Sequence, residues 1–149
     1  MITVAPCLLT SPESRLLLEK LSAELHAITG DSGGSHFSVD AMDDPRARWV
    51  LARNRHGDAV GCGAIRPLSD EIAELKRMFS DRSAPGIGHA LLTFLETSAK
   101  RLGYRTLWLE TRRVNHRAVQ FYLQHGFVRI ENYGPYVNRP EAVCFAKEL

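Results

Sequence analysis

Residues 74–92 constrain the fold of this chain more than any other segment. The run Glu74-Leu-Lys-Arg-Met-Phe-Ser80 suits a strand, although its composition fits a helix almost as well. A few residues later, Pro85-Gly-Ile-Gly-His-Ala-Leu-Leu92 begins a segment whose apolar residues repeat at helical spacing as far as Leu102. A strand that turns through glycines into a helix presents free N–H groups and the positive end of the helix dipole, which together hold phosphate oxygens. An ordinary tight turn would explain the glycines equally well.

Two common phosphate-binding motifs do not fit this turn. A dinucleotide-binding fingerprint needs a third small residue where Leu91 stands, and a P-loop needs a Gly-Lys-Ser/Thr sequence that the chain lacks. The turn therefore indicates a phosphate site of another kind, or none.

The remaining segments predict a mixed sheet covered by helices. Two neighbouring runs, 48–53 and 58–66, are joined by the turn 54–57 and predict an antiparallel hairpin. The expected order of strand, helix, three strands, helix, strand, helix and two strands places the chain in the α/β class, with a central mixed sheet. The other expected elements are a strand at 2–8, a capped helix from 11 to about 30, a loop at 31–45, a strand at 71–80, a helix at 86–102, a strand at 105–110, a helix at 115–125 and strands from 126 and at 142–147.

Composition indicates an ordinary globular protein with residues 1–149 in a single domain. Nineteen Lys and Arg residues against 17 Asp and Glu residues give a formal net charge of +2, so we expect no nucleic-acid or membrane partner. The first 15 residues lack a signal-peptide pattern and no segment has about 18 uninterrupted apolar residues, so we expect a soluble, cytoplasmic protein. The three spaced cysteines suit packed thiols, the histidines lack metal-ligand spacing, and we expect no metal.

A second motif begins at Asn115. The sequence Asn115-His-Arg-Ala-Val-Gln-Phe-Tyr-Leu-Gln-His-Gly-Phe127 reads as a capped helix that carries Tyr122 and ends at Gly126. Together with the glycine turn, it resembles the GNAT superfamily of N-acetyltransferases over roughly residues 60–149. The closing Tyr133-Gly-Pro-Tyr136 and Val143-Cys-Phe145 are similar to a small bacterial subgroup of these enzymes.

This resemblance implies a GNAT-like acyl-CoA N-acyltransferase fold, acetyl-CoA as cosubstrate and the amine of a small molecule or peptide as acceptor. It also implies that Tyr122 faces the thioester sulfur and that Asn115 lies beside the cofactor arm. The residues it implies for cofactor binding are Met78, Phe79, Ser80, Arg82, Pro85, Gly86, Ile87, Gly88, His89, Ala90, Asn115, Ala118 and Tyr122. Two of these have structural alternatives, since Asn115 also suits an N-cap and Tyr122 a half-buried core aromatic.

The phosphate turn departs from the family pattern. Ser83 stands where the family usually has Gln or Arg, Pro85 removes one N–H group, and the turn is about two residues short. Arg82 is the residue that could replace the missing cation.

Acetyl transfer to an amine needs a base for the ammonium proton, donors for the carbonyl oxygen and an acid for the leaving thiol. Tyr122 suits the acid, and backbone N–H groups near Met78 suit the carbonyl oxygen. We expect Glu74 to be the base, because the resemblance matches it to the catalytic glutamate of some GNAT enzymes and because strand alternation would put it on the same face as Met78. A salt-bridged strand carboxylate is the alternative for Glu74, and Glu110 is the second candidate for the base.

The acceptor stays open. The first helix, the loop 31–45 and residues 133–140 are expected to shape its pocket, and Glu110, Tyr133 and Tyr136 are expected to line it. Two other functions also stay open: a CoA-binding domain without turnover, and a basic module for an acidic partner. The basic module would use Arg105, Arg112, Arg113, His116 and Arg117. A homodimer is left open as a further partner.

Overall fold

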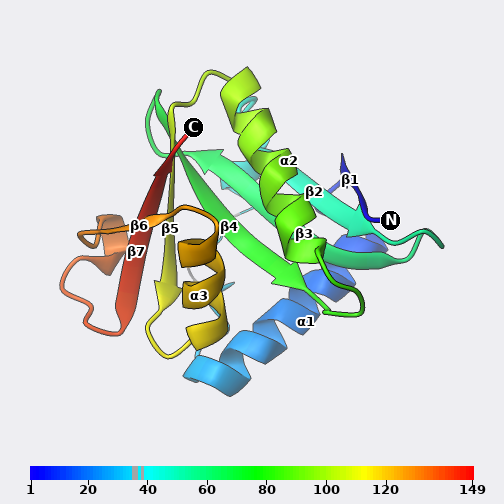
Figure 1. Ribbon diagram of the computed structural model, residues 1–149, viewed down its shortest axis with the longest axis horizontal. Coiled ribbons are helices and arrows are strands. Elements are labelled where there is room, and N and C mark those ends of the chain that lie inside the picture. The colour runs from blue at the N-terminus through cyan, green and yellow to red at the C-terminus, as the bar shows by residue number, and fades with distance from the viewer. Residues whose placement is uncertain (35–36, 38) are drawn as a thin grey trace.

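The computed structural model describes residues 1–34, 37 and 39–149, and its elements follow the predicted order (Figure 1). The strand expected at 71–80 is a strand, which resolves the ambiguity with a helix. The short 3-10 helix Asp40–Asp43 lies in the segment 31–45, which was expected to be a loop with at most a short ordered piece, and the 3-10 helix Gly134–Tyr136 was not predicted. The strands are β1 (Thr3–Pro6), β2 (Arg48–Arg53), β3 (Ala59–Pro67), β4 (Ile72–Ser80), β5 (Thr106–Arg112), β6 (Val128–Ile130) and β7 (Ala142–Glu148), and the helices are α1 (Pro12–Thr29), α2 (Ile87–Arg101) and α3 (His116–Gln124).

Local signals explain where α1 begins and ends. The Ser11 side chain accepts a hydrogen bond from the Ser14 N–H group at 3.1 Å, and Pro12 occupies the first turn, where a missing N–H group does no harm. Gly30 ends the helix in the left-handed conformation, with φ of 80°. Both boundaries match those expected from the sequence.

The seven strands form one mixed sheet in the order β1-β2-β3-β4-β5-β7-β6. The predicted β2–β3 hairpin is antiparallel, and β4 and β5 form the parallel pair. Helices α2 and α3 pack on one face of the sheet and α1 on the other (Figure 1), so the sheet separates two apolar cores. The predicted α/β class and mixed sheet are therefore confirmed.

The parallel pair β4–β5 is short. It is joined only from Ile72 to Glu74 on one side and from Thr106 to Trp108 on the other, and beyond this point the two strands diverge (Figure 1). The sheet thus opens toward the carboxyl ends of both strands. Irregular openings of this kind next to parallel strands are common places for ligands.

A bulge at Arg77 changes the side to which β4 points its residues. Arg77 has φ of 54°, and the register with β3 shifts between Cys62 and Ala64. Leu75 and Met78 consequently both pack toward α2, whereas regular alternation would place them on opposite faces. The expectation that Glu74 and Met78 share a face is wrong, because the bulge inserts one residue between them.

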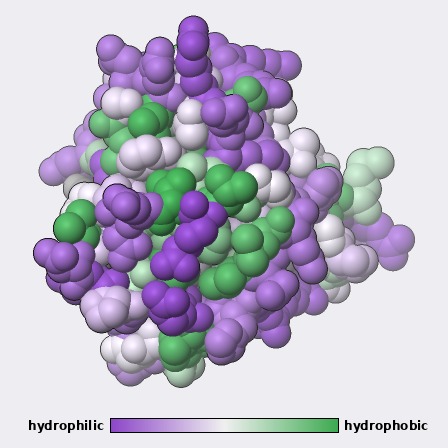
Figure 2. Space-filling model, turned by 60° about the vertical axis from the view of Figure 1, so that its left-hand side comes forward, coloured by the Kyte–Doolittle hydropathy of each residue, from purple (hydrophilic) through white to green (hydrophobic). Residues whose placement is uncertain are grey.

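The outer edge of the sheet is formed by the three-residue strand β6, which pairs with β7 alone. The side of the molecule that carries β6 and β7 shows apolar patches interrupted by polar side chains (Figure 2).

In the described residues, no helix is both long enough and apolar enough to cross a membrane.

Candidate active site

Two cavities meet at the opening between β4 and β5. One lies toward α2 and α3 and has a volume of about 640 Å³, and the other lies toward α1 and has a volume of about 130 Å³. Six residues line both cavities, namely Leu21, Leu25, Met78, Asn115, Ala118 and Tyr122. The two cavities are therefore contiguous at the opening in the sheet, where the larger one extends to the start of α2 and the smaller one to charged side chains of β4 and β5.

The larger cavity ends at the start of α2. Helix α2 begins at Ile87 after Gly86, so the N–H groups of its first turn have no partner within the helix. A Cβ atom on Gly88 would lie 2.9 Å from Cε1 of Phe121, so glycine is what allows α2 and α3 to approach here. These exposed N–H groups and the helix dipole suit the phosphates of a nucleotide cofactor.

Most residues expected to bind the cofactor line this larger cavity. They are Met78, Phe79, Ser80, Arg82, Pro85, Gly86, Ile87, Gly88, His89, Asn115, Ala118 and Tyr122. Ala90 is not among the described residues that line this cavity. Its N–H group donates to the Gly86 carbonyl at 2.9 Å. That donor is used inside the helix.

The proline in the unusual turn before α2 lies outside the first turn of the helix. Pro85 precedes the N-cap Gly86, so its missing N–H group is not one of those in the first helical turn. Arg82 lies beside the cavity, where its Nη2 is 2.7 Å from Oε1 of Glu24. His89 Nδ1 lies 3.2 Å from His125 Nε2 at the same end of the cavity.

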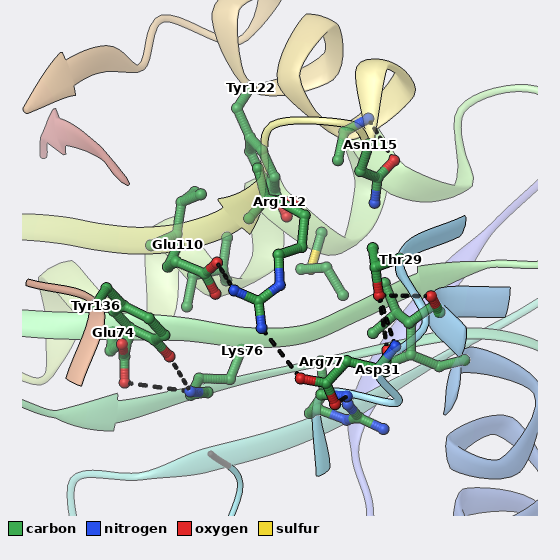
Figure 3. Close-up of a pocket in the computed structure, with 18 residues that line it drawn as sticks. Thr29, Asp31, Glu74, Lys76, Arg77, Glu110, Arg112, Asn115, Tyr122 and Tyr136 are labelled. Carbon is green, nitrogen blue, oxygen red and sulfur yellow. Dashed lines mark hydrogen bonds and ion pairs between the residues drawn. The ribbon is translucent and has the colours of Figure 1, made fainter. Parts of the chain in front are cut away.

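Tyr122 lines both cavities. It belongs to α3, is largely buried, and extends toward the smaller cavity (Figure 3). Among the described residues, the structure gives its hydroxyl no hydrogen-bond partner. Burial raises the pKa of this phenol, so it keeps its proton at neutral pH.

Asn115 is the N-cap of α3, as its structural alternative proposed, and it also lines both cavities. Its Oδ1 accepts from the Ala118 N–H group at 3.3 Å, which makes it the N-cap of α3. A role as N-cap therefore does not remove it from the site.

The smaller cavity is rich in charge (Figure 3). Glu110 and Arg112 project from β5, and Arg112 Nη1 lies 3.7 Å from Glu110 Oε2, too far for a hydrogen bond. Arg112 Nη2 lies 3.1 Å from Asp31 Oδ2. Burial is the largest cause that raises the pKa of Glu110, and the neighbouring cations Arg112 and Lys76 oppose it.

Glu74 lies at the closed end of this cavity and both of its oxygens have partners. Arg66 Nε donates to Oε1 at 2.9 Å, and the Tyr133 hydroxyl donates to Oε2 at 2.5 Å. The side chain is only 2% exposed. Glu74 thus has the contacts of the salt-bridged strand carboxylate that was its structural alternative.

The two tyrosines expected around the acceptor differ in position. Tyr136 lines the cavity, and its hydroxyl accepts from Lys76 Nζ at 3.1 Å. Tyr133 lies one layer behind it, against Glu74 and the Trp108 ring, and does not line either cavity.

Sequence reasoning missed Lys76 and Arg112 as lining residues. A period of two along β4 and β5 could have placed Lys76 beside Glu74 and Arg112 beside Glu110. Asp31 begins the loop that was expected to help shape the acceptor pocket, but it was not singled out as a lining residue. The proposed basic surface is divided, because Arg112 lies in the cavity and Arg105 at the other end of β5.

The cysteines and metal-ligating side chains offer no further chemistry. Cys62 and Cys144 are fully buried, and burial raises the pKa of Cys62 to about 12. In the chain as described, no group of three or more His, Cys, Asp or Glu side chains is arranged to hold a metal ion.

An anion-binding end, a long cavity and an opening between two strands suit an acyl group carried on a phosphorylated arm. The fold and the site therefore define a class of protein, the acyl-CoA-dependent transferases. Comparison with known proteins gives the particular family. The Acetyltransferase (GNAT) family is matched over residues 15–127, and the chain belongs to this family.

Individual relatives agree with this assignment. The chain is 32% identical over 136 residues to the IAA acetyltransferase of Azospirillum brasilense, covering 89% of this chain and 88% of that protein. A structure assigned as an acyl-CoA N-acyltransferase from Klebsiella pneumoniae superposes with a TM-score of 0.84 and 28% identity, covering 100% of this chain and 98% of the other. A GNAT acetyltransferase from Elizabethkingia anophelis with acetyl-CoA bound has the same fold, with a TM-score of 0.72, 20% identity and coverage of 99% and 98%.

The GNAT resemblance and its predicted fold are thus confirmed. Acetyl-CoA is the acyl donor of this family, and the larger cavity has the volume and the anion-binding end that this donor requires. The protein is an acyltransferase of this family.

Proposed function

We propose that this protein is an N-acetyltransferase that moves the acetyl group of acetyl-CoA to a primary amine by direct attack on the thioester. The observation that carries this proposal is that the cofactor cavity and the charged cavity meet at Met78 and Tyr122. An amine held in the charged cavity would reach the thioester through the opening in the sheet. Holding the two reactants together in this way is itself a large part of the rate acceleration.

The contacts of the two carboxylates favour Glu110 over Glu74 as the base. Both oxygens of Glu74 already have partners, Arg66 and Tyr133, so neither oxygen is free to contact an amine. Oε2 of Glu110 has no hydrogen bond among the described residues, and a pKa raised by burial makes a carboxylate a stronger base. Glu74 then acts by holding Arg66 and Tyr133 in place.

Tyr122 is proposed to assist the leaving thiol. Its pKa is raised by burial, whereas an ordinary thiol has a pKa of about 8.5. Complete proton transfer from the phenol to the thiolate would therefore be uphill in the free protein. A hydrogen bond that strengthens as charge develops on sulfur is the contribution that this phenol can make.

The bulge at Arg77 is proposed to supply donors for the carbonyl oxygen. A bulge leaves one residue of its strand without a ladder partner, and Met78, which follows Arg77, lines both cavities. A backbone N–H group at this position would face the acyl oxygen, as expected for residues near Met78.

Further expectations from the sequence remain proposals. They are the single domain over residues 1–149, the bacterial subgroup suggested by Tyr133–Tyr136 and Val143–Phe145, the cytoplasmic location and the homodimer. The similarity to the A. brasilense protein over 89% of the chain supports the single domain and a bacterial relationship.

The proposed function is tested by measuring CoA release with a panel of primary amines and by mass spectrometry of each product. A gain of one acetyl group on the amine, with stoichiometric CoA, is expected. Acetyl-CoA binding without transfer to any amine would indicate the CoA-binding domain without turnover. Failure to bind acetyl-CoA would contradict the proposal and favour the alternative function, a basic module for an acidic partner.

A further inference from the structure

We propose that the acceptor is a small zwitterion that carries both an amine and a carboxylate, such as a free α-amino acid, and that Arg112 binds its carboxylate. The inference rests on the proposed acetyl transfer and specifies its substrate class. It is carried by two buried atoms of opposite charge in the smaller cavity that have no hydrogen-bond partner among the described residues.

Glu110 and Arg112 form this pair. Oε2 of Glu110 and Nη1 of Arg112 are both buried, and neither makes a hydrogen bond within the described part of the chain. Their separation of 3.7 Å is too long for them to satisfy one another. Buried polar atoms are normally hydrogen-bonded, and each one left without a partner is destabilising. A ligand that brings one donor and one acceptor would satisfy both atoms.

The other charged groups around this cavity are already engaged. Lys76 donates to Tyr136, and Glu74 is held by Arg66 and Tyr133. Both terminal nitrogens of Arg77 bond to α1 and the segment after it, through Ser22 and Ser32. Its Nε is buried without a partner, but these two bonds tie the guanidinium to that segment.

The balance of charge favours a ligand with no net charge. Three cationic side chains and three carboxylates line the cavity, namely Lys76, Arg77, Arg112, Asp31, Glu74 and Glu110. A zwitterion preserves this balance, whereas a phosphate group would add two negative charges near three carboxylates. An amine without a carboxylate would satisfy Glu110 and leave Arg112 Nη1 without a partner.

The size of the cavity limits the ligand. Its volume of about 130 Å³ is close to that of an engineered cavity of roughly 150 Å³ that holds benzene. About one six-membered ring therefore fits, which matches a small free amino acid. In a peptide, the residue that carries the terminal amine has an amide in place of its carboxylate, so it offers Arg112 no negative charge.

The test compares three acceptors that share one side chain: the free amino acid, its amide and the amine without the carboxyl carbon. The side chain is taken from the amino acid with the highest rate among the twenty. We expect kcat/KM for the free acid to exceed that for the amide by roughly 10- to 100-fold, the range of a charge-assisted hydrogen bond. This ratio is independent of the fraction of protein that is folded.

Variants of Arg112 identify the residue responsible. Arg112→Gln should bring the ratio of acid to amide close to one, and Arg112→Lys should retain part of it, because the charge remains but the planar fork is lost. Arg113→Gln is the matched control, since Arg113 is exposed next to Arg112 and its side chain bonds only to the Pro140 carbonyl among the described residues. Its ratio should equal that of the wild type.

Two outcomes would overturn the inference in distinguishable ways. If the amide or the plain amine is acetylated as efficiently as the free acid, or if Arg112→Gln keeps the preference, the zwitterion is wrong while acetyl transfer stands. If no amine is acetylated at all, the proposed function fails and the inference fails with it.

Discussion

The Tyr133 hydroxyl donates to Oε2 of Glu74 at 2.5 Å, while Arg66 holds the other oxygen of the same carboxylate. This contact joins the segment before β7 to strand β4 at the closed end of the smaller cavity. Burial is the largest cause that raises the pKa of Tyr133, the charge of Glu74 is the next, and this hydrogen bond adds to both. The phenol therefore keeps its proton and remains a donor. Glu74 is accordingly part of the wall that shapes the cavity.

The first prediction separates the two carboxylates by their pH–rate profiles. If Glu110 takes the ammonium proton, Glu110→Gln should lower the rate by about 10²- to 10⁴-fold near neutral pH and recover part of it at high pH, where more amine is already neutral. Glu74→Gln should lose rate by a factor that does not shrink with pH. Thermal melts of both variants serve as the control for folding. Alkaline recovery in Glu74→Gln alone would restore Glu74 as the base.

The second prediction concerns stability. Because burial raises the pKa of Glu110, the folded protein holds this proton more tightly than the unfolded chain does. The stability that the group contributes is fully present below its ordinary pKa of 4.5 and is lost as pH rises through the folded value. Relative to the wild type, Glu110→Gln should therefore gain in unfolding temperature as pH increases from about 4.5 to neutrality.

Calorimetric melts at several pH values check this prediction. Glu141→Gln removes an exposed carboxylate near the same arginine and should change the unfolding free energy by no more than about 0.5 kcal/mol. If the unfolding temperature of Glu110→Gln minus that of the wild type falls as pH rises toward neutrality, the raised pKa of Glu110 is contradicted.

The third prediction is that Tyr122→Phe lowers kcat by about 10²- to 10⁴-fold and leaves acetyl-CoA affinity unchanged. The hydroxyl has no partner among the described residues, so its removal leaves no buried group unsatisfied, and the melting temperature should be preserved. Steady-state kinetics and calorimetric binding give the two quantities. Unchanged turnover would leave Tyr122 as a packing residue.

The fourth prediction concerns the anion-binding end of the larger cavity. Acetyl-CoA should bind at least about tenfold more tightly than acetyl-pantetheine, which lacks the phosphates, because the first turn of α2 offers free N–H groups. Isothermal titration calorimetry measures both. Equal affinity for the two ligands would mean that the short turn with Pro85 makes no phosphate contact.

The fifth prediction is that Gly61→Ala destabilises the fold by about 1–3 kcal/mol, the usual range for overpacking. A Cβ atom at Gly61 would lie 2.7 Å from the backbone oxygen of Phe79 and 2.8 Å from Cγ2 of Ile87, so strand and helix would have to separate. Gly34→Ala is the control, since its Cβ would meet Ser32 at an ordinary 3.5 Å. Denaturant unfolding compares the two, and equal stability would show that α2 can shift without loss.

Much of the fold could be predicted because its signals are local. Ser11, Pro12 and Gly30 set the ends of α1, and Asn115 sets the start of α3, each through contacts with neighbours in sequence. The glycine turn and the Tyr122 helix likewise gave the cofactor side of the site.

The acceptor side could not be predicted in the same way. The bulge at Arg77 depends on the register between two strands, and no feature of the sequence 74–80 reveals it. Regular alternation without the bulge put Glu74 on the same face as Met78 and so favoured Glu74 as the base. The contact of Arg112 with Asp31 spans 81 positions, and that of Tyr133 with Glu74 spans 59, so neither has a local signal.

The short pairing of β4 with β5 has a consequence for hydrogen exchange. Beyond Glu74 and Trp108, the edges of the two strands that face each other are not joined by ladder hydrogen bonds. Amide protons on these edges can exchange with solvent without unfolding of the sheet, although they lie near its centre. A pantetheine arm bound in this gap would slow the exchange of these amide protons. Cofactor binding should therefore slow amide hydrogen exchange more at these central strand edges than at the surface of the protein.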